Sequence, residues 1–356
     1  MIAVIADDIT GAAEMAGIAH RLGLRVQLAM WPRAVNDCDV LVVATDTRSM
    51  HEAEAVAETR RVAEALGEIP GVDGVFKKTD SALRGHVVAE LSALLPLTRY
   101  SRALYIPANP SKGRIIRDGV YYIGGTPLHE TDFSFDPEFP AYSSSLCERL
   151  AGCGEHGVMY ADATDDADIC SAVAGAGDDT LLAGAADLFT AYLKSKFPCR
   201  ETPADGFRLD MDDCLIVCGS TQSRPIDCGV PTEYMPTAVY DETVSPDGWI
   251  AGLASAYASR HAMIIAVRDR HRTGKGIAVY LRDTMARCVS ELVSVHCPGD
   301  LVIEGGATAF AILSRLGWNS FTITQEIAPG VIRMRSEESG TYVTMKPGSY
   351  PWGGLF

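Results

Sequence analysis

The sequence predicts an α/β protein with two domains, each a mostly parallel sheet flanked by helices. The N-terminal part alternates short β-branched runs with amphipathic helical stretches, which is typical of parallel strands joined by crossover helices. The same alternation resumes after a segment rich in proline and acidic residues at 197–213. With 356 residues, 47% of them hydrophobic, the chain is long enough to bury two cores.

Short apolar runs in the first half predict buried strands. These runs are Ile2–Ala6, Val26–Ala29, Val40–Ala44, Val75–Lys78, Leu104–Ile106, Val158–Tyr160 and Thr180–Ala183. Residues His51–Leu66 are rich in Ala, Glu and Arg and predict a helix with one apolar stripe. Arg114–Ile123 is β-like, Gly124–Ser145 has the composition of a loop, and further helices are expected near Asp165–Val173 and at Asp187–Lys196.

The segment at 197–213 predicts the domain boundary, because it combines prolines, a glycine and several acids. We therefore expect one domain at 1–205 and another at 213–356. In the second domain, apolar runs predict strands at Leu215–Cys218, Met263–Val267, Leu301–Ile303 and Thr322–Ile323.

Charge and cysteine usage narrow the function. The net charge of −15 opposes attraction to nucleic acid and to anionic membranes, so neither is an expected partner. An anionic ligand would need local basic residues and backbone amides. The ten cysteines form no CxxC pair and predict reduced core thiols, with Cys214 and Cys218 on one face of a strand. The first residues lack a basic region, so we expect no signal peptide and a cytoplasmic protein.

Two aspartates follow the first predicted strand, in Ala6-Asp7-Asp8-Ile9-Thr10-Gly11-Ala12. The carboxyl end of a strand in a parallel sheet is where ligands bind, so Asp7 and Asp8 are candidate site residues. The alternative is helix capping, in which Asp8 or Thr10 accepts from the free amides of the next helix. Capping accounts for one acid but not for both.

A second polar cluster, Lys78-Thr79-Asp80-Ser81-Ala82-Leu83-Arg84-Gly85, also follows an apolar strand. It supplies cations for a carboxylate, an acid that could serve as a base, and a hydroxyl donor. Arg84 is our candidate carboxylate anchor, because a guanidinium can bind both carboxylate oxygens at once. The alternative is a solvated charged turn.

A third stretch, from Pro107 to Gly119, follows the strand at Leu104–Ile106. Prolines stiffen this loop, and Asn109 or Arg114 could bond to substrate oxygens. An ordinary turn before a hairpin explains the pattern nearly as well.

In the second half, glycine and hydroxyl residues stand between strands and helices. Gly219 and Ser220 follow one strand, Gly305, Gly306, Ala307 and Thr308 follow another, and Lys346 and Gly348 lie near the end. Glycines let backbone amides approach phosphate oxygens, and a helix start favours negative charge. The chain contains neither GxxxxGK[ST] nor a GxGxxG after the first strand, so a Walker-type phosphate loop and a dinucleotide fingerprint are both missing.

These motifs resemble those of the four-carbon acid sugar kinase family. Its ADD(L/I)TGA motif matches Ala6–Ala12, its lysine-rich DS(A/T)LRG motif matches Lys78–Gly85, and its proline-asparagine loop ending in DG matches Pro107–Gly119. The resemblance implies an N-terminal domain that binds the acid sugar and a C-terminal domain that binds ATP at the glycine motifs. Two departures are Ala307, where the family usually has an acid, and the ending Ser349–Gly353.

The resemblance also implies the reaction, in which ATP with Mg²⁺ phosphorylates the terminal hydroxyl of threonate, erythronate or 3-oxo-tetronate. Arg84 and Lys78 would hold the carboxylate, and Asp8 or Asp80 would act as the catalytic base. Asp7, Ser81, Asn109 and Arg114 would complete the substrate site. The alternatives are a phosphatase or hydrolase that uses the Asp7-Asp8 pair as nucleophile and a degenerate member that only binds small molecules. The resemblance allows a homodimer.

Overall fold

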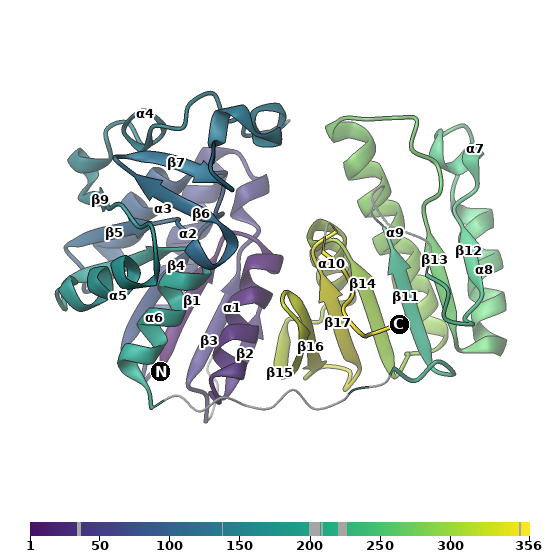
Figure 1. Cartoon of the computed structure of the whole chain (residues 1–356). Coiled ribbons are helices and arrows are strands. Elements are labelled where there is room, and N and C mark those ends of the chain that lie inside the picture. Colours follow the sequence, from purple (N-terminus) through teal and green to yellow (C-terminus); the bar gives the residue numbers. More distant parts are fainter. Residues whose placement is uncertain (34–36, 137, 199–206, 208, 220–225, 349) are drawn as a thin grey trace. The chain divides into compact units, whose positions relative to one another are not determined.

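The computed structural model describes the whole chain except residues 34–36, 137, 199–206, 208, 220–225 and 349. The chain divides into two compact units, Met1–Thr202 and Pro203–Phe356. Each contains a mostly parallel sheet flanked by helices, which confirms the predicted fold class (Figure 1). No helix in the described part of the chain is long and apolar enough to cross a membrane.

The first unit is built on a parallel sheet with the strand order β2-β3-β1-β4-β10-β5-β9. The strands are β1 (Ile2–Ala6), β2 (Val26–Ala29), β3 (Val40–Ala44), β4 (Gly74–Lys78), β5 (Arg102–Ile106), β9 (Val158–Tyr160) and β10 (Thr180–Gly184). Strands β1 and β3 are buried along their whole length, which explains their uninterrupted apolar sequence. All seven apolar runs predicted in this half are strands in the structure.

Helices cover both faces of this sheet. They are α1 (Ile9–Arg21), α2 (Glu52–Gly67), α3 (Val87–Leu94), α4 (Leu146–Arg149), α5 (Asp166–Gly175) and α6 (Ala186–Lys196). Helix α6 packs against α1 and α5, whereas α2 packs against α3 on the opposite face. A small antiparallel sheet of β6 (Arg114–Arg117), β7 (Val120–Ile123) and β8 (Thr126–Pro127) is followed by the 3₁₀ turns η4 (Leu128–Glu130) and η5 (Asp132–Phe135).

The register of the sheet brings the strand ends level with one another. Ala6 at the end of β1 pairs with Ala44 of β3 and with Lys78 of β4. Lys78 in turn pairs with Gly184 of β10, which pairs with Ile106 of β5. A Cβ atom on Gly184 would lie 2.0 Å from the carbonyl oxygen of Ile106, so only glycine fits there. The polar segments that follow these strands therefore all begin at the same edge of the sheet, the one formed by the carboxyl ends of the strands.

The second unit has the strand order β12-β13-β11-β14-β17-β16-β15, in which the pairs from β12 to β17 are parallel and the last two pairs are antiparallel. The strands are β11 (Cys214–Cys218), β12 (Thr232–Tyr234), β13 (Met263–Ala266), β14 (Asp300–Glu304), β15 (Ser320–Ala328), β16 (Val331–Ser336) and β17 (Tyr342–Lys346). Strands β12, β16 and β17 were not predicted from the sequence.

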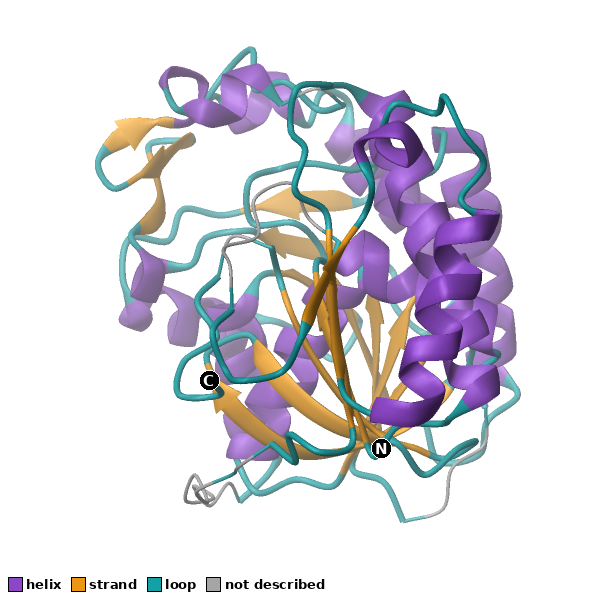
Figure 2. Ribbon diagram, turned by 90° about the vertical axis from the view of Figure 1, so that its right-hand side faces the viewer, coloured by secondary structure: helices purple, strands orange, loops and turns teal. Residues whose placement is uncertain are grey.

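The second sheet carries its long helices on one face. Helices α8 (Asp247–Arg260), α9 (Lys275–Val295) and α10 (Gly306–Leu316) pack in a row there, with the short α7 (Thr237–Tyr240) preceding them (Figure 2). The described cysteines are free, and Cys214 and Cys218 are buried as expected. Cys147, Cys170 and Cys297 are exposed, however, so the prediction of core thiols is wrong for these positions.

Candidate active site

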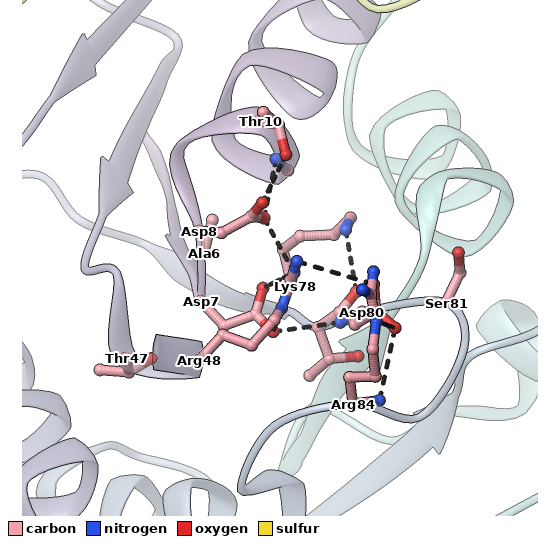
Figure 3. A network of polar contacts seen from close by, with 12 residues as sticks. Ala6, Asp7, Asp8, Thr10, Thr47, Arg48, Lys78, Asp80, Ser81 and Arg84 are labelled. Atoms are coloured by element: carbon pink, nitrogen blue, oxygen red, sulfur yellow. Dashed lines mark hydrogen bonds and ion pairs between the residues drawn. The ribbon is translucent and has the colours of Figure 1, made fainter. Parts of the chain in front are cut away.

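In the first unit, the centre of the predicted site is Arg48, which lies in the 3₁₀ turn η1 (Thr47–Ser49) after β3. Its Nε and Nη2 donate to the two carboxylate oxygens of Asp7 at 3.1 and 2.7 Å, and Nη2 also donates to Asp8 Oδ1 at 2.8 Å. Its Nη1 lies 3.7 Å from Asp80 Oδ1. One guanidinium thus joins three aspartates that follow β1 and β4 (Figure 3).

Asp7 is the most enclosed of these acids, with its side chain 3% exposed. Its Oδ2 also accepts from the backbone N–H of Asp80 at 3.2 Å. Burial raises the pKa of Asp7, and the nearby Arg48 opposes this shift. Both oxygens of Asp7 are engaged by the protein, which suits a residue that holds the site together and argues against a nucleophile.

Asp8 caps the first helix and also belongs to the cluster around Arg48. It caps α1 by accepting from the backbone N–H of Gly11 at 2.9 Å, and it also accepts from the Thr10 hydroxyl. Burial raises the pKa of Asp8, but Arg48 and Lys78 outweigh it and hold the pKa below its ordinary value. Its side chain is 16% exposed, so this ionised carboxylate is more accessible than Asp7.

Asp80 and Arg84 form a close pair within one turn. Arg84 donates from Nε and Nη2 to the two oxygens of Asp80 at 3.0 and 2.8 Å, and from Nη1 to Asp136 at 3.3 Å. Burial raises the pKa of Asp80, but Arg48 and Arg84 hold it well below its ordinary value. The guanidinium fork of Arg84, predicted to bind a substrate carboxylate, is therefore occupied by carboxylates of the protein.

Arg114 lies beside this pair and has a different environment. It donates from Nη1 to the Ser81 hydroxyl, and its guanidinium carbon is 5.7 Å from the ring centre of Phe133. The same ring lies 5.5 Å from the guanidinium carbon of Arg84. Among the described residues, Arg114 has no acidic partner. The guanidinium of Arg114 is therefore not neutralised by a carboxylate of the described residues.

Lys78 and Asn109 are more buried than their predicted roles require. The Lys78 ammonium donates to the Thr79 carbonyl at 2.8 Å and lies 3.8 Å from Glu14. A Cβ atom on Gly11 would lie 2.6 Å from Asp8 Oδ1 and 3.1 Å from Lys78 Nζ, so glycine there lets these two charges approach. Asn109 is 1% exposed, and its Oδ1 accepts from the backbone N–H of Asp187 at the start of α6.

Three residues of this cluster, Arg48, Asp136 and Phe133, were not predicted from the sequence. A usable signal existed for Arg48, because Thr45-Asp46-Thr47-Arg48-Ser49 follows an apolar strand just as the other two polar motifs do. What the sequence did not reveal is that β3 lies next to β1 in the sheet. Asp136 and Phe133 belong to a stretch whose composition predicted only a loop.

The glycine motifs of the second unit also meet at neighbouring strand ends. Cys218 of β11 pairs with Glu304 of β14, and Glu304 pairs with Lys346 of β17. The residues that follow, Gly219 and Gly305, therefore lie at one edge beside Lys346. Ser220 lies outside the described residues, as does Ser349 of the unusual ending.

Lys346 and Glu304 form a buried ion pair at this edge. The ammonium donates to Glu304 Oε1, to the carbonyl of Pro347 at 3.2 Å and to that of Gly348 at 3.3 Å. It also lies 4.8 Å from the ring centre of Trp352. The second carboxylate oxygen of Glu304, Oε2, is buried, and no described residue forms a hydrogen bond with it.

Helix α10 begins beside this pair without a capping side chain. Its first residues, Gly306 and Ala307, follow Gly305, whose φ of 99° favours glycine. No acidic residue stands in its first turn, and Ala307 is exposed. A Cβ atom on Gly219 would lie 2.8 Å from Thr308, so the β11 end and α10 are in close contact.

Comparisons with known proteins agree with this division of motifs. Residues 2–174 match the family model of a sugar-binding N-terminal domain, and residues 250–350 match that of a nucleotide-binding C-terminal domain. The chain is 29% identical to a D-threonate kinase from Bordetella bronchiseptica, over 93% of this chain and 88% of the relative. It is 23% identical to a 3-oxo-tetronate kinase from Haemophilus influenzae, over 98% of this chain and 97% of the relative.

A solved structure of the Haemophilus influenzae protein HI1011 has the same fold. It superposes with a TM-score of 0.72 at 20% identity, over 99% of this chain and 97% of that chain. A D-erythronate kinase from Heliobacterium modesticaldum is 35% identical, over 45% of this chain and 37% of the relative. Taken with the two domain matches and the full-length relatives, these likenesses show that the chain belongs to the four-carbon acid sugar kinase family and is a carbohydrate kinase.

Proposed function

We propose that this kinase uses ATP to phosphorylate the terminal hydroxyl of a four-carbon acid sugar such as threonate, erythronate or 3-oxo-tetronate. We assign the acid sugar to the domain at 1–205 and ATP to the domain at 213–356. The observation that carries the proposal is the cluster around Arg48, in which the pKa values of Asp8 and Asp80 are lowered, together with Arg114. Arg114 bonds to Ser81, the residue after Asp80, and has no acidic partner in the described part of the chain. Such a site offers both a charge for a carboxylate and acceptors for hydroxyl groups.

We assign the carboxylate of the substrate to Arg114, with Arg84 and Lys78 adding positive charge around it. Ser81, which already bonds to Arg114, would contact the same end of the substrate. Asn109 contributes by fixing the start of α6, and Asp7 by fixing Arg48. This assignment moves the main anchor from Arg84 to Arg114, because the fork of Arg84 holds Asp80.

Asp8 is the better of the two candidate bases, since Asp80 is 6% exposed and is held by Arg84 through both oxygens. The lowered pKa of Asp8 makes it a weak base. Phosphoryl transfer depends mainly on positioning and charge stabilisation, so a carboxylate that orients the attacking hydroxyl suffices. Asp80 would serve as a support for Arg84.

We assign the ATP phosphates to the strand-end edge of the second unit. Phosphate oxygens would be bound by the backbone amides of the glycine motifs, namely Gly219, Ser220, Gly305, Gly306, Ala307 and Thr308. Lys346 and Gly348, at and just after the end of β17, would contribute to the same site. Mg²⁺ would neutralise phosphate charge there, held mainly by the nucleotide. The protein oxygen that fits such an ion is Glu304 Oε2, a buried atom without a hydrogen-bond partner among the residues that the structure describes.

The decisive experiment is a coupled ADP-release assay with ATP and a panel of acids: D-threonate, D-erythronate, their L-isomers, 3-oxo-tetronate and 4-hydroxythreonine. We expect at least one panel member to give rapid ADP release, and Asp8→Asn to lower kcat for it by about 100-fold or more. If no acid of the panel stimulates ADP release, the proposed substrate class is contradicted. An unchanged kcat in Asp8→Asn would remove Asp8 as the base.

One observation favours a second candidate, a degenerate member that binds small molecules without phosphorylating them. Ala307 stands where the family usually has an acid, at the start of α10. Isothermal titration with ATP and Mg²⁺ separates the two, because an absence of ATP binding would favour the degenerate form.

A further inference from the structure

A buried polar network lies on the face of the first sheet that carries α2 and α3. At its centre is Glu90 of α3, which is 2% exposed. Its Oε2 lies 2.8 Å from the ammonium of Lys77, a β4 residue with 0% exposure. The same oxygen accepts from the hydroxyls of Thr47 and Thr59 at 2.9 and 3.1 Å. Thr47 begins the turn η1 of the site described above, whereas Glu90, Lys77 and Thr59 are not among the residues assigned to that site.

Stability alone is a weak explanation for this network. Removing two charges from water costs much of what their attraction returns, so a buried ion pair is often replaceable by apolar residues of similar volume. This pair is distinguished by the number of partners of Glu90, because one carboxylate oxygen contacts a cation and two hydroxyls from different elements. Thr59 belongs to α2, whereas Thr47 begins the turn η1 that carries Arg48.

The turn η1 needs to be held in place. Asp46, which precedes it, has a φ of 55°, in the left-handed region that non-glycine residues seldom adopt. The backbone N–H of Arg48 donates to the carbonyl of Asp7 at 3.1 Å, and the Thr47 hydroxyl donates to Glu90. These contacts hold the turn from two sides.

We propose that Glu90, held by Lys77, is a positioning residue for catalysis, acting through Thr47 on the turn that places Arg48 among Asp7, Asp8 and Asp80. This inference rests on the proposed role of that cluster in acid-sugar binding. A shift of Arg48 by a fraction of an ångström would disturb all three carboxylates at once, because its guanidinium contacts each of them.

The two threonines provide a matched test. Thr47→Val and Thr59→Val each remove one buried hydroxyl from the same carboxylate oxygen and keep the shape of the side chain. We expect both to lower the melting temperature, Thr47→Val by more, because the Thr47 hydroxyl also bonds to the Thr45 hydroxyl at 3.0 Å. Only Thr47→Val should lower kcat/KM for the acid sugar, by about tenfold, because only Thr47 is attached to the Arg48 turn.

Three further readings complete the experiment, made with the panel member that the wild-type enzyme phosphorylates fastest. Thr59→Val should stay within about twofold of wild type in kcat/KM, Thr47→Ser should restore most of the loss, and the KM for ATP should be unchanged in all variants. Equal losses of kcat/KM in the two valine variants, or no loss in Thr47→Val, would overturn the inference. Failure of the proposed substrate class would appear instead as inactivity of the wild-type enzyme on the panel.

Discussion

Each unit has its candidate site at the carboxyl ends of its own parallel strands, but the polar groups found there differ between the two units. In the first unit, Arg48 joins three aspartates, so side chains supply almost all of the polar groups. In the second, one Lys346–Glu304 pair stands beside glycines and an uncapped helix start. The contrast fits the ligands that we propose for the two units, because a small polyhydroxy acid and a phosphate chain need different contacts. The first needs directional side-chain contacts, and the second needs close access to backbone amides.

The largest effect is expected at Arg48, where Arg48→Lys tests whether side-chain geometry governs the first unit. Lysine keeps the positive charge among the aspartates but cannot bond to several oxygens as a planar fork. We expect kcat/KM for the acid sugar to fall by about 100-fold or more, with the KM for ATP unchanged, in steady-state kinetics. Arg25→Lys is the control, because Arg25 binds Asp39 through Nε and Nη2 at the surface and should leave both constants unchanged. A similar loss of kcat/KM in Arg48→Lys and Arg25→Lys would contradict the view that side-chain geometry governs the site of the first unit.

The next largest effect concerns the ion pair of the second unit. Lys346→Met alone would leave Glu304 buried without its partner, at a cost of about 3–5 kcal/mol in the free energy of unfolding. The double variant with Glu304→Gln avoids this cost. We expect it to weaken ATP binding by about 10- to 100-fold in isothermal titration, since a charged hydrogen bond to phosphate is lost.

A matched pair exists at the other end of the same strand for this test. Arg333 binds Asp300, the first residue of β14, and both are buried. Arg333→Met with Asp300→Asn should change the melting temperature but not the affinity for ATP. Equal weakening of ATP binding in both double variants would show that the Lys346 pair acts only through stability.

An effect of intermediate size should separate Arg114 from Arg84. Loss of Arg114 in Arg114→Ala removes a cation that no acid of the described chain neutralises, so the KM for the acid sugar should rise about 10- to 100-fold with a smaller change in kcat. Arg84→Ala frees Asp80 instead and should lower kcat more than it raises KM. The reverse pattern in initial-rate kinetics would return the anchor role to Arg84.

The smallest expected effect is that of Ala307→Glu, which restores an acid at the start of α10. A carboxylate in the first turn of a helix is stabilising by about 0.3–1 kcal/mol, which thermal unfolding can detect. The same negative charge next to ATP phosphates should change the KM for ATP by less than about tenfold unless a metal ion lies between them. A larger gain in ATP affinity that depends on Mg²⁺ would show that Ala307 limits metal handling in this chain.

Local pattern predicted most of the elements. Residues Ile2–Ala6, Val26–Ala29 and Val40–Ala44 are strands with the predicted bounds, and the helix expected at His51–Leu66 is observed at Glu52–Gly67. Strands β16 and β17 were missed because charged and polar residues such as Arg333 and Thr344 interrupt their apolar pattern. Both of these side chains are buried, and Arg333 is paired with Asp300, which no local signal reveals.

The candidate site was predictable only in part, for a similar reason. Asp7, Asp8, Asp80 and Arg84 each follow a strand, and the structure brings them together. Their partners depend on the strand order, which places β3 beside β1 and so delivers Arg48. Sequence spacing does not encode that neighbourhood. It also does not tell which guanidinium is already neutralised, and this is why Arg84 was preferred to Arg114.

Gly184 has a consequence for how related sequences vary. A methyl group there would collide with the carbonyl oxygen of Ile106, at 2.0 Å, because the φ of 154° at Gly184 turns that group toward the neighbouring strand β5. Any related chain that keeps these strand ends together must therefore carry glycine at this position, whichever acid it accepts. A relative with a different residue at this position is expected to have the ends of these two strands further apart.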